Sequence, residues 1–249
     1  MSNLIARSAG AAGQILYGLY AWILFVLTVL FSVLAATFVP GLHRRRRWLA
    51  AAARTFFWLA GIPANVSGLE KLPEEHCVVV ANHAGYIDGV ILQAFLPPRF
   101  SFVIKGEARN WPVAHFVLRR IGAKFVERFI ATGSARDVRA LLKAASVGES
   151  LAVFPEGTFI RKPGLSRFRL GAFAAAIKGE MPIVPLSIRG SRHILPPKTL
   201  LPAPGPLQID ILEPIDAAGA SSAELAERAR QSILEVLDEP DLLSAESTG

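Results

Sequence analysis

The chain has 249 residues, one cysteine, a formal net charge of +7 and a hydrophobic fraction of 52%. This length holds one large α/β domain with an appendage and leaves little room for a second enzyme domain, while one cysteine excludes an intramolecular disulfide framework and agrees with a reducing cytoplasmic location. The positive charge favours anionic partners, and because no nucleic-acid-binding motif is recognisable, we expect a membrane partner and no nucleic acid.

The N-terminal part of the chain carries a long uncharged segment. No charged residue occurs from Ile15 to Val39, and about 25 helical residues are longer than the roughly 30 Å hydrocarbon core of a bilayer. A basic run at 44–47 follows it, against Arg7 alone before it, so the positive-inside rule places the following domain in the cytoplasm. We expect a retained segment that spans or re-enters the inner (cytoplasmic) membrane, since a cleaved signal peptide has its basic stretch before a shorter apolar region.

A second apolar stretch runs from Trp48 to Ile62 and is interrupted by Arg54. As a helix it would measure about 22 Å, which is short for a membrane span. Its aromatic residues suit the headgroup boundary and the neighbouring arginines suit anionic lipid, so we expect it at the membrane interface, with an amphipathic core helix as the alternative. The chain thus divides into a membrane-anchoring helical segment at 1–65 and a second domain at 66–249.

Short apolar runs follow one another through the second domain, separated by helical stretches. This alternation predicts an α/β fold in which a mixed, mostly parallel sheet is flanked by helices. The strand candidates are Cys77–Ala81, Ser101–Ile104, Lys124–Glu127, Leu151–Phe154, Ile183–Ile188 and Leu207–Leu212.

Three helices can be placed between and after these strands. One is expected at 88–96, one at 134–147 with a capping start at its first residue, and one from a Ser221 and Glu224 capping box to about Glu239. The segment from His193 to Pro206 is rich in proline and is expected to be a surface connection.

The turn after the first predicted strand has the sequence Asn-His-Ala-Gly-Tyr-Ile-Asp, from 82 to 88. In a continuous helix His83 and Asp88 would point about 140° apart, but they can meet if His83 lies in the turn and Asp88 in the first helical turn. A carboxylate bonded to one imidazole nitrogen leaves the other nitrogen bare to take a proton from a hydroxyl. We expect His83 to be a general base and Asp88 its orienting group, and an ordinary surface or capping contact is the alternative.

The sequence contains no clear candidate for a protein nucleophile that could act together with this pair. It contains no Gly-x-Ser-x-Gly elbow, and Cys77 lies inside an apolar run rather than at a strand end. The base is therefore expected to activate a substrate hydroxyl directly. No Cys and His cluster has metal-ligand spacing, so neither a metal nor another cofactor is predicted.

A second block, Phe-Pro-Glu-Gly-Thr, lies at 154–158. Together with Asn-His-x-x-x-x-Asp it resembles the glycerolipid acyltransferase family, whose best-known bacterial members are 1-acylglycerol-3-phosphate acyltransferases. The blocks at 122–128 and 181–186 are also similar to family motifs, and the resemblance covers about residues 66 to 215. It implies a glycerol-3-phosphate acyltransferase-like fold.

The resemblance also implies roles at matching positions. His83 would take the proton of the acceptor hydroxyl as that hydroxyl attacks an acyl thioester, and Asp88 would hold the imidazole. Backbone amides near Gly157, or at the helix start after His83, would hold the tetrahedral oxyanion. The residues implied for substrate binding are Lys105, Arg128, Glu156, Gly157, Thr158 and Arg169.

One position departs from the family pattern. Many relatives carry a basic residue directly after Glu-Gly-Thr, whereas this chain has Phe159, with Arg161 and Lys162 shortly after it. Arg167 and Arg169 are the expected compensation, and a solvated basic loop is the alternative. The contacts with an acceptor phosphate are therefore expected to differ from those in such relatives.

The resemblance implies a membrane-bound acyltransferase that transfers a fatty acyl group from acyl-CoA or acyl-carrier protein to a lysophospholipid acceptor, first of all 1-acylglycerol-3-phosphate, to give phosphatidate. Two alternatives stay open. One is an acyltransferase or transacylase for another lysophospholipid or a lyso-aminolipid, and the other is a non-catalytic membrane protein that binds lipid.

Overall fold

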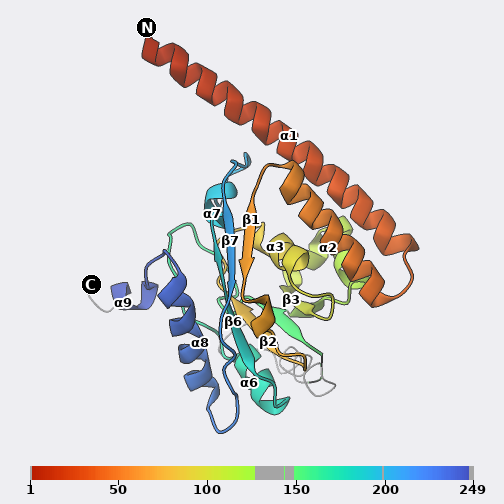
Figure 1. Ribbon diagram of the computed structural model, residues 1–249, viewed down its shortest axis with the longest axis vertical. Coiled ribbons are helices and arrows are strands. Elements are labelled where there is room, and N and C mark those ends of the chain that lie inside the picture. Colours follow the sequence, from red (N-terminus) through yellow and green to blue (C-terminus); the bar gives the residue numbers. More distant parts are fainter. Residues whose placement is uncertain (1, 127–142, 144–148, 198, 247–249) are drawn as a thin grey trace.

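The computed structural model describes residues 2–126, 143, 149–197 and 199–246 (Figure 1). A seven-stranded sheet forms its centre, in the order β1-β7-β6-β2-β5-β3-β4. Among the described strands the β6 and β7 pair is antiparallel and the other neighbours run parallel, which confirms the predicted mixed, mostly parallel sheet. The strands are β1 (Ala64–Ser67), β2 (Val78–Ala81), β3 (Ser101–Lys105), β4 (Lys124–Val126), β5 (Leu151–Val153), β6 (Ile183–Arg189) and β7 (Leu207–Ile211).

Helices cover both faces of this sheet (Figure 1). The α-helices of the described residues are α1 (Ser2–Phe38), α2 (Leu42–Leu59), α3 (Asp88–Phe95), α4 (Pro112–Arg120), α6 (Gly171–Lys178), α7 (Ser191–Ile194), α8 (Ser222–Val236) and α9 (Leu242–Glu246). The described 3₁₀ helices are η1 (Leu69–Lys71) and η2 (Gly106–Asn110).

Strand β2 shows why its residues form the centre of the fold. Its four residues are buried without exception, because successive side chains of a strand point to opposite faces and here both faces are covered. Val79 packs in the apolar layer that contains residues of α2 and α3, and Val80 packs in the layer that contains residues of α6 and α8. The turn that carries His83 therefore leaves from a strand that is fully buried.

Strand β1 is absent from the sequence-based prediction. It has the sequence Ala-Asn-Val-Ser, lies at the edge of the sheet and alternates between half-buried and exposed residues. Its two apolar residues, Ala64 and Val66, are separated by an asparagine and give no apolar run to detect. Its pairing with β7 depends on tertiary structure.

The predicted capping box at the start of α8 is present. The Glu224 N–H donates to Ser221 Oγ at 3.3 Å, and the Ser221 N–H donates to Glu224 Oε2 at 2.8 Å. The helix ends at Val236, slightly before the predicted end, because Leu237 is already extended. The helix predicted at 134–147 lies outside the described residues apart from Lys143.

Helix α2 is amphipathic and packs on the domain. Ala53 and Phe57 are buried in the layer shared with α3, while Trp58 on the other side is 78% exposed. The expectation that the arginine run meets anionic lipid is wrong for Arg46, which is 3% exposed and donates to the carbonyl of Ile121 at 2.8 Å. That arginine ties α2 to the sheet layer, so its charge is not available to a lipid headgroup.

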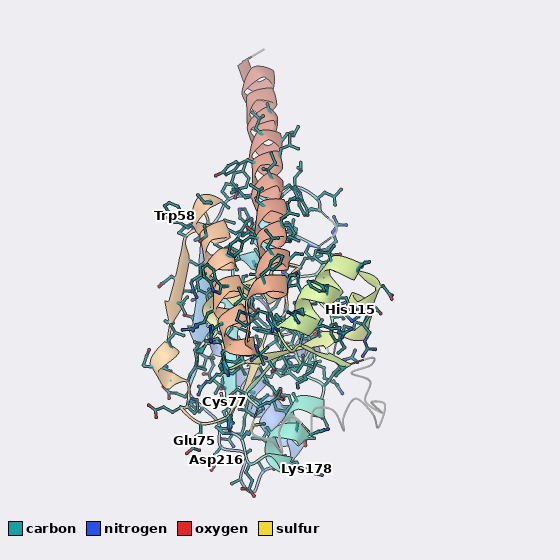
Figure 2. The ribbon with its side chains drawn as sticks, turned by 90° about the vertical axis from the view of Figure 1, so that its right-hand side faces the viewer. Trp58, Glu75, Cys77, His115, Lys178 and Asp216 are labelled. Carbon is teal, nitrogen blue, oxygen red and sulfur yellow. The ribbon has the colours of Figure 1, made fainter. Side chains whose placement is uncertain are left out.

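Helix α1 lies along α2 and extends beyond the rest of the molecule at its N-terminal end (Figures 1 and 2). The hydroxyls of Tyr17 and Tyr20 donate to the carbonyls at the end of α2, at 3.0 and 2.9 Å. By length and composition Ala12–Phe38 is able to cross a membrane, and 17% of its most apolar window is buried against the protein. Its outward face is therefore apolar and uncovered, as membrane association requires.

Candidate active site

The candidate active site lies where β2 and β5 end. These neighbouring strands are parallel, so the chain leaves both of them at the same edge of the sheet, the position at which α/β folds gather ligand-binding loops. His83 follows the end of β2 and Glu156 follows the end of β5. Residues far apart in the sequence therefore meet at this edge.

His83 and Asp88 contact one another across the turn between β2 and α3. The Nδ1 atom of His83 lies 2.8 Å from Oδ2 of Asp88, the first residue of α3. The same carboxylate oxygen accepts the backbone N–H groups of Ala84 at 2.7 Å and Gly85 at 2.8 Å. Asp88 is fully buried, and a carboxylate can only accept a hydrogen bond. A neutral His83 that bonds to it therefore carries its proton on Nδ1, which leaves Nε2 bare and able to accept a proton.

Asn82 fixes the residue before the histidine. Its side-chain amide donates to the Ile188 carbonyl at 2.9 Å, and its side-chain oxygen accepts the Ile188 N–H at 2.7 Å. Both bonds reach across to β6, which continues beside β2. The asparagine thus extends the sheet pairing by one residue with its side chain and sets the direction in which the turn leaves.

Glu156 holds the turn between β2 and α3 from the β5 side. Its Oε1 accepts the backbone N–H of His83 at 2.7 Å, and its Oε2 accepts the backbone N–H of Ser166 at 3.0 Å together with the Ser166 hydroxyl. Burial raises the pKa of this carboxyl group, while the hydrogen bonds from Ser166 and His83 oppose the rise. Both carboxylate oxygens have partners within the protein, which indicates that Glu156 positions the turn.

Aromatic rings surround the imidazole. The ring of His83 stacks on Phe154 with 4.1 Å between centroids, and Phe159 meets it edge-on at 4.7 Å. Phe159 also contacts the ring of Tyr86 at 4.7 Å. The side chain that replaces a basic residue of the family pattern therefore lies directly against the expected base and makes this part of the site apolar.

The amides expected to hold an oxyanion have internal partners. The N–H of Gly157 donates to the Phe154 carbonyl at 3.0 Å, and those of Ala84 and Gly85 donate to Asp88. A donor that is already bonded cannot stabilise a developing oxyanion without moving. In this conformation the predicted amides shape the two loops instead.

Comparison with known proteins decides the family. The family model "Acyltransferase" matches residues 63–189, which is half of the chain and includes both loops of the site. The chain belongs to the acyltransferase family. It is an O-acyltransferase.

Similar proteins are named for two acceptors. The chain is 28% identical to the lyso-ornithine lipid O-acyltransferase of Pseudomonas aeruginosa, over 93% of its own length and 92% of that protein. It is also 28% identical to the 1-acyl-sn-glycerol-3-phosphate acyltransferase of the same organism, over 84% and 83%. The crystal structure of the 1-acyl-sn-glycerophosphate (LPA) acyltransferase PlsC from Thermotoga maritima shares the fold, with a TM-score of 0.73 over 91% of this chain and 97% of that one at 22% identity.

The predicted substrate-binding residues of this acyltransferase differ in how they are placed relative to the Glu156 loop. Arg169 comes close to the Glu156 loop, since its Nε donates to the Glu156 carbonyl at 3.2 Å and would lie 2.7 Å from a Cβ on Gly157, whose φ is +73°. Thr158 is exposed in the same loop. Lys105 ends β3 at the same sheet edge and pairs with Glu107 at 2.8 Å.

Two further predictions concern charges. Arg128 lies outside the described residues, so its place at the site stays a prediction. Arg161, Lys162 and Arg167 are exposed, and their part in phosphate binding also stays a prediction. Among the described residues no group of three or more His, Cys, Asp or Glu side chains is arranged to hold a metal ion.

A buried network behind Glu156 is missing from the sequence-based prediction. Arg230 of α8 is 2% exposed, its Nε donates to the Ser166 carbonyl at 3.3 Å, and its guanidinium also pairs with Asp241. Ser166 is thus held by α8 while it holds Glu156. Sequence spacing carries no signal for this chain of contacts, because its members come from three separate segments.

We predict that Ser166→Ala moves the acidic limb of the kcat/KM profile to higher pH. The substitution removes one of the hydrogen bonds that favour the charged form of Glu156, so burial raises the pKa of that carboxyl further and it takes up a proton at a higher pH. The N–H of His83 then faces a neutral acceptor and the turn is less well held. Acyl-transfer rates measured across acidic and neutral pH test this.

Two features make this measurement specific. His83, Arg169 and Arg230 are unchanged in the variant, so the comparison isolates the hydroxyl group of Ser166. Ser166→Thr keeps the hydroxyl and is expected to retain the wild-type profile. Superimposable profiles for Ser166→Ala and the wild type would contradict the role of the Ser166 hydroxyl.

Proposed function

We propose that this acyltransferase moves a fatty acyl group from the thioester of acyl-CoA or acyl-carrier protein to the free hydroxyl of 1-acylglycerol-3-phosphate, giving phosphatidate, at the cytoplasmic face of the inner membrane. The observation that carries the proposal is the 2.8 Å contact between His83 Nδ1 and the buried Asp88. It prepares Nε2 for proton transfer in a chain of the acyltransferase family.

The reaction needs only one covalent exchange. The hydroxyl oxygen of the acceptor forms a bond to the thioester carbonyl carbon while its proton passes to Nε2 of His83, and collapse of the tetrahedral intermediate breaks the carbon–sulfur bond. The leaving thiolate takes the proton back from the imidazolium, so the base is regenerated. Asp88 stabilises the transient positive charge through the hydrogen bond to Nδ1.

Direct transfer fits the chemistry of the described residues. Cys77 is buried, and burial raises the pKa of its thiol to about 11, so little thiolate forms at neutral pH. The acyl group is therefore expected to pass straight from donor to acceptor. A steady-state pattern that requires both substrates in one complex, in contrast to ping-pong kinetics, follows from this.

Two observations support a phosphorylated acceptor. Arg169 lies at the Glu156 loop, and guanidinium groups suit phosphate because their planar fork forms paired hydrogen bonds. Several relatives, such as those from Pseudomonas aeruginosa and Saccharomyces cerevisiae, are named 1-acyl-sn-glycerol-3-phosphate acyltransferases. Arg128 would add a second guanidinium if it meets the site as its motif implies.

A second candidate acceptor is a lyso-aminolipid such as lyso-ornithine lipid. One relative that is similar along nearly its whole length is named for that acceptor, and Phe159 places an aromatic ring beside His83 and Tyr86. Aromatic faces attract ammonium groups and offer nothing to a phosphate dianion. The position after Glu-Gly-Thr therefore favours an acceptor that is less anionic.

The deciding experiment offers the purified full-length protein a mixture of lyso-acceptors. Lysophosphatidate, another lysophospholipid and lyso-ornithine lipid are each supplied with and without a radiolabelled acyl thioester, and the mass of the lipid product is measured. Labelled phosphatidate supports the proposal, and a labelled aminolipid supports the second candidate. Product formed without any thioester contradicts the proposed acyl donor and supports the transacylase alternative.

We predict that Phe159→Arg shifts acceptor preference toward lysophosphatidate by about tenfold in the ratio of kcat/KM values, the change expected for one added charge-assisted hydrogen bond. The matched control is Ile160→Arg, which adds the same charge one residue further along an exposed part of the loop. Equal preference shifts in both variants would show a general electrostatic effect and contradict a specific role for position 159.

A further inference from the structure

The proline-rich connection between α7 and β7 contacts the long N-terminal helix. We call residues Thr199–Pro206 the proline arm. The indole N–H of Trp22 in α1 donates to the Leu200 carbonyl at 2.6 Å, and a Cβ on Gly18 would lie 2.6 Å from the Leu201 side chain. Figure 1 shows this segment projecting past the end of the sheet toward α1.

The proline arm is also tied to the catalytic turn. At its base the Ala203 N–H donates to the carbonyl of Ile194, the last residue of α7, at 2.8 Å. The next carbonyl, that of Leu195, lies 3.1 Å from the position of a Cβ on Gly85, midway between His83 and Asp88. One short stretch of backbone therefore links the site to α1.

The tip of the proline arm is apolar and uncovered. Leu200 is 79% exposed and Leu201 is 44% exposed, and the prolines that follow restrict the backbone and remove N–H donors. The outward face of α1 continues this surface with exposed large hydrophobic side chains: Leu16, Leu19, Ile23, Val26, Leu27 and Leu30. Exposed apolar surface of this extent marks a contact with lipid or with another protein.

We propose that the proline arm enters the same membrane leaflet as α1 and holds the catalytic turn at the level of the lipid headgroups. The bilayer is the occupant favoured by continuity, because Leu200 and Leu201 lie directly on the one described helix that is long and apolar enough to cross a membrane. The catalytic part of this inference rests on the proposed function. A base held at this level meets the hydroxyl of a lipid acceptor without extracting that lipid from the bilayer.

Insertion is measured by a fluorescent label at the tip. Because Cys77 is buried with a pKa of about 11, a Leu200→Cys variant of the full chain takes a thiol-reactive, environment-sensitive dye at position 200 alone. Vesicles of phosphatidylethanolamine and phosphatidylglycerol are expected to shift its emission to the blue, and lipids with a quencher on the acyl chain are expected to lower its intensity.

The matched control carries the same dye at the opposite end of the molecule. Exposed Lys178 lies far from α1 (Figure 2), so labelled Lys178→Cys is expected to show neither the shift nor the quenching. Equal responses at the two positions, or none at position 200, would overturn insertion. A blue shift that appears without vesicles as protein concentration rises would also overturn it, by showing that a second copy of the chain covers the tip.

The effect on catalysis is measured with charged substitutions. Leu200→Asp and Leu201→Asp are expected to lower turnover of a vesicle-embedded lyso-acceptor by about tenfold, since a carboxylate opposes insertion into an anionic interface. Turnover of a short-chain acceptor dissolved in water is expected to stay unchanged. Leu69→Asp, at an exposed leucine of η1, is the matched control and should affect neither rate.

The two acceptors keep this inference separate from the proposed function. A wild-type protein that acylates neither acceptor contradicts the proposed function, and the labelled variants then still decide whether the tip enters lipid. A wild-type protein that acylates both acceptors, with arm variants that match it on vesicles, contradicts the role of the proline arm alone.

Discussion

The substitution His83→Ala is expected to lower kcat for acyl transfer by about 10²- to 10⁴-fold, the usual contribution of a general base. Without the imidazole, the hydroxyl proton must pass to water as the carbon–oxygen bond forms. Residual turnover is expected, because the protein still holds acceptor and thioester together and proximity alone accelerates the reaction. The rate of radiolabelled acyl transfer by the purified variant measures the effect.

Loss of activity must be separated from loss of fold. The ring of His83 stacks on Phe154 at 4.1 Å, so alanine also removes packing, and His83→Gln retains more of this volume. Thermal melting of both variants shows whether the fold persists. The matched control is His76→Ala at an exposed histidine before β2, which should keep wild-type activity, and near-normal turnover in His83→Ala with an intact fold would remove the proposed mechanism.

The central pair of the site could be predicted because its geometry is local. His83 and Asp88 are close in sequence, and an apolar run followed by a helix start is enough to place them on a strand, a turn and a first helical turn. The buried strands could be predicted for the same reason, since their apolar runs are continuous. Edge strand β1, which has no such run, could not.

Glu156 was expected at the site as a substrate-binding residue, but the contacts that support the pair could not be predicted because they depend on sheet order. Glu156 reaches the His83 N–H only because β5 lies directly beside β2. Which strands are neighbours cannot be read from the pattern of apolar runs. For the same reason Ser166 and Arg230 gave no signal. Their contacts form after the layers have assembled.

Composition also misled in one place for a physical reason. A run of arginines after an apolar segment predicts an orientation in the membrane, but it does not distinguish exposed from buried members. Arg46 satisfies backbone carbonyls beneath α2, with bonds to Pro98 at 3.1 Å and Ile121 at 2.8 Å. A helix can thus use part of a basic run to bind the backbone carbonyls of loops in the domain that it covers.

The substitution Asp88→Asn is expected to lower kcat by about 10²-fold, which is less than the upper range for His83→Ala. The backbone N–H groups of Ala84 and Gly85 both point at Oδ2, so they favour an asparagine conformer with its oxygen in that place. The Nδ1–H of His83 then keeps an acceptor and the productive tautomer persists. What disappears is the negative charge that stabilises the imidazolium, and a 10²-fold loss corresponds to about 2.7 kcal/mol.

Comparison with Asp88→Ala separates orientation from charge. Alanine removes the acceptor of three N–H groups in a fully buried position, so the imidazole loses its orientation and the fold loses stability as well. We therefore expect activity to fall in the order wild type, Asp88→Asn, Asp88→Ala, with a lower melting temperature for the alanine variant. The exposed Asp216→Asn serves as the control, and equal losses for Asn and Ala at position 88 would show that the charge contributes nothing beyond orientation.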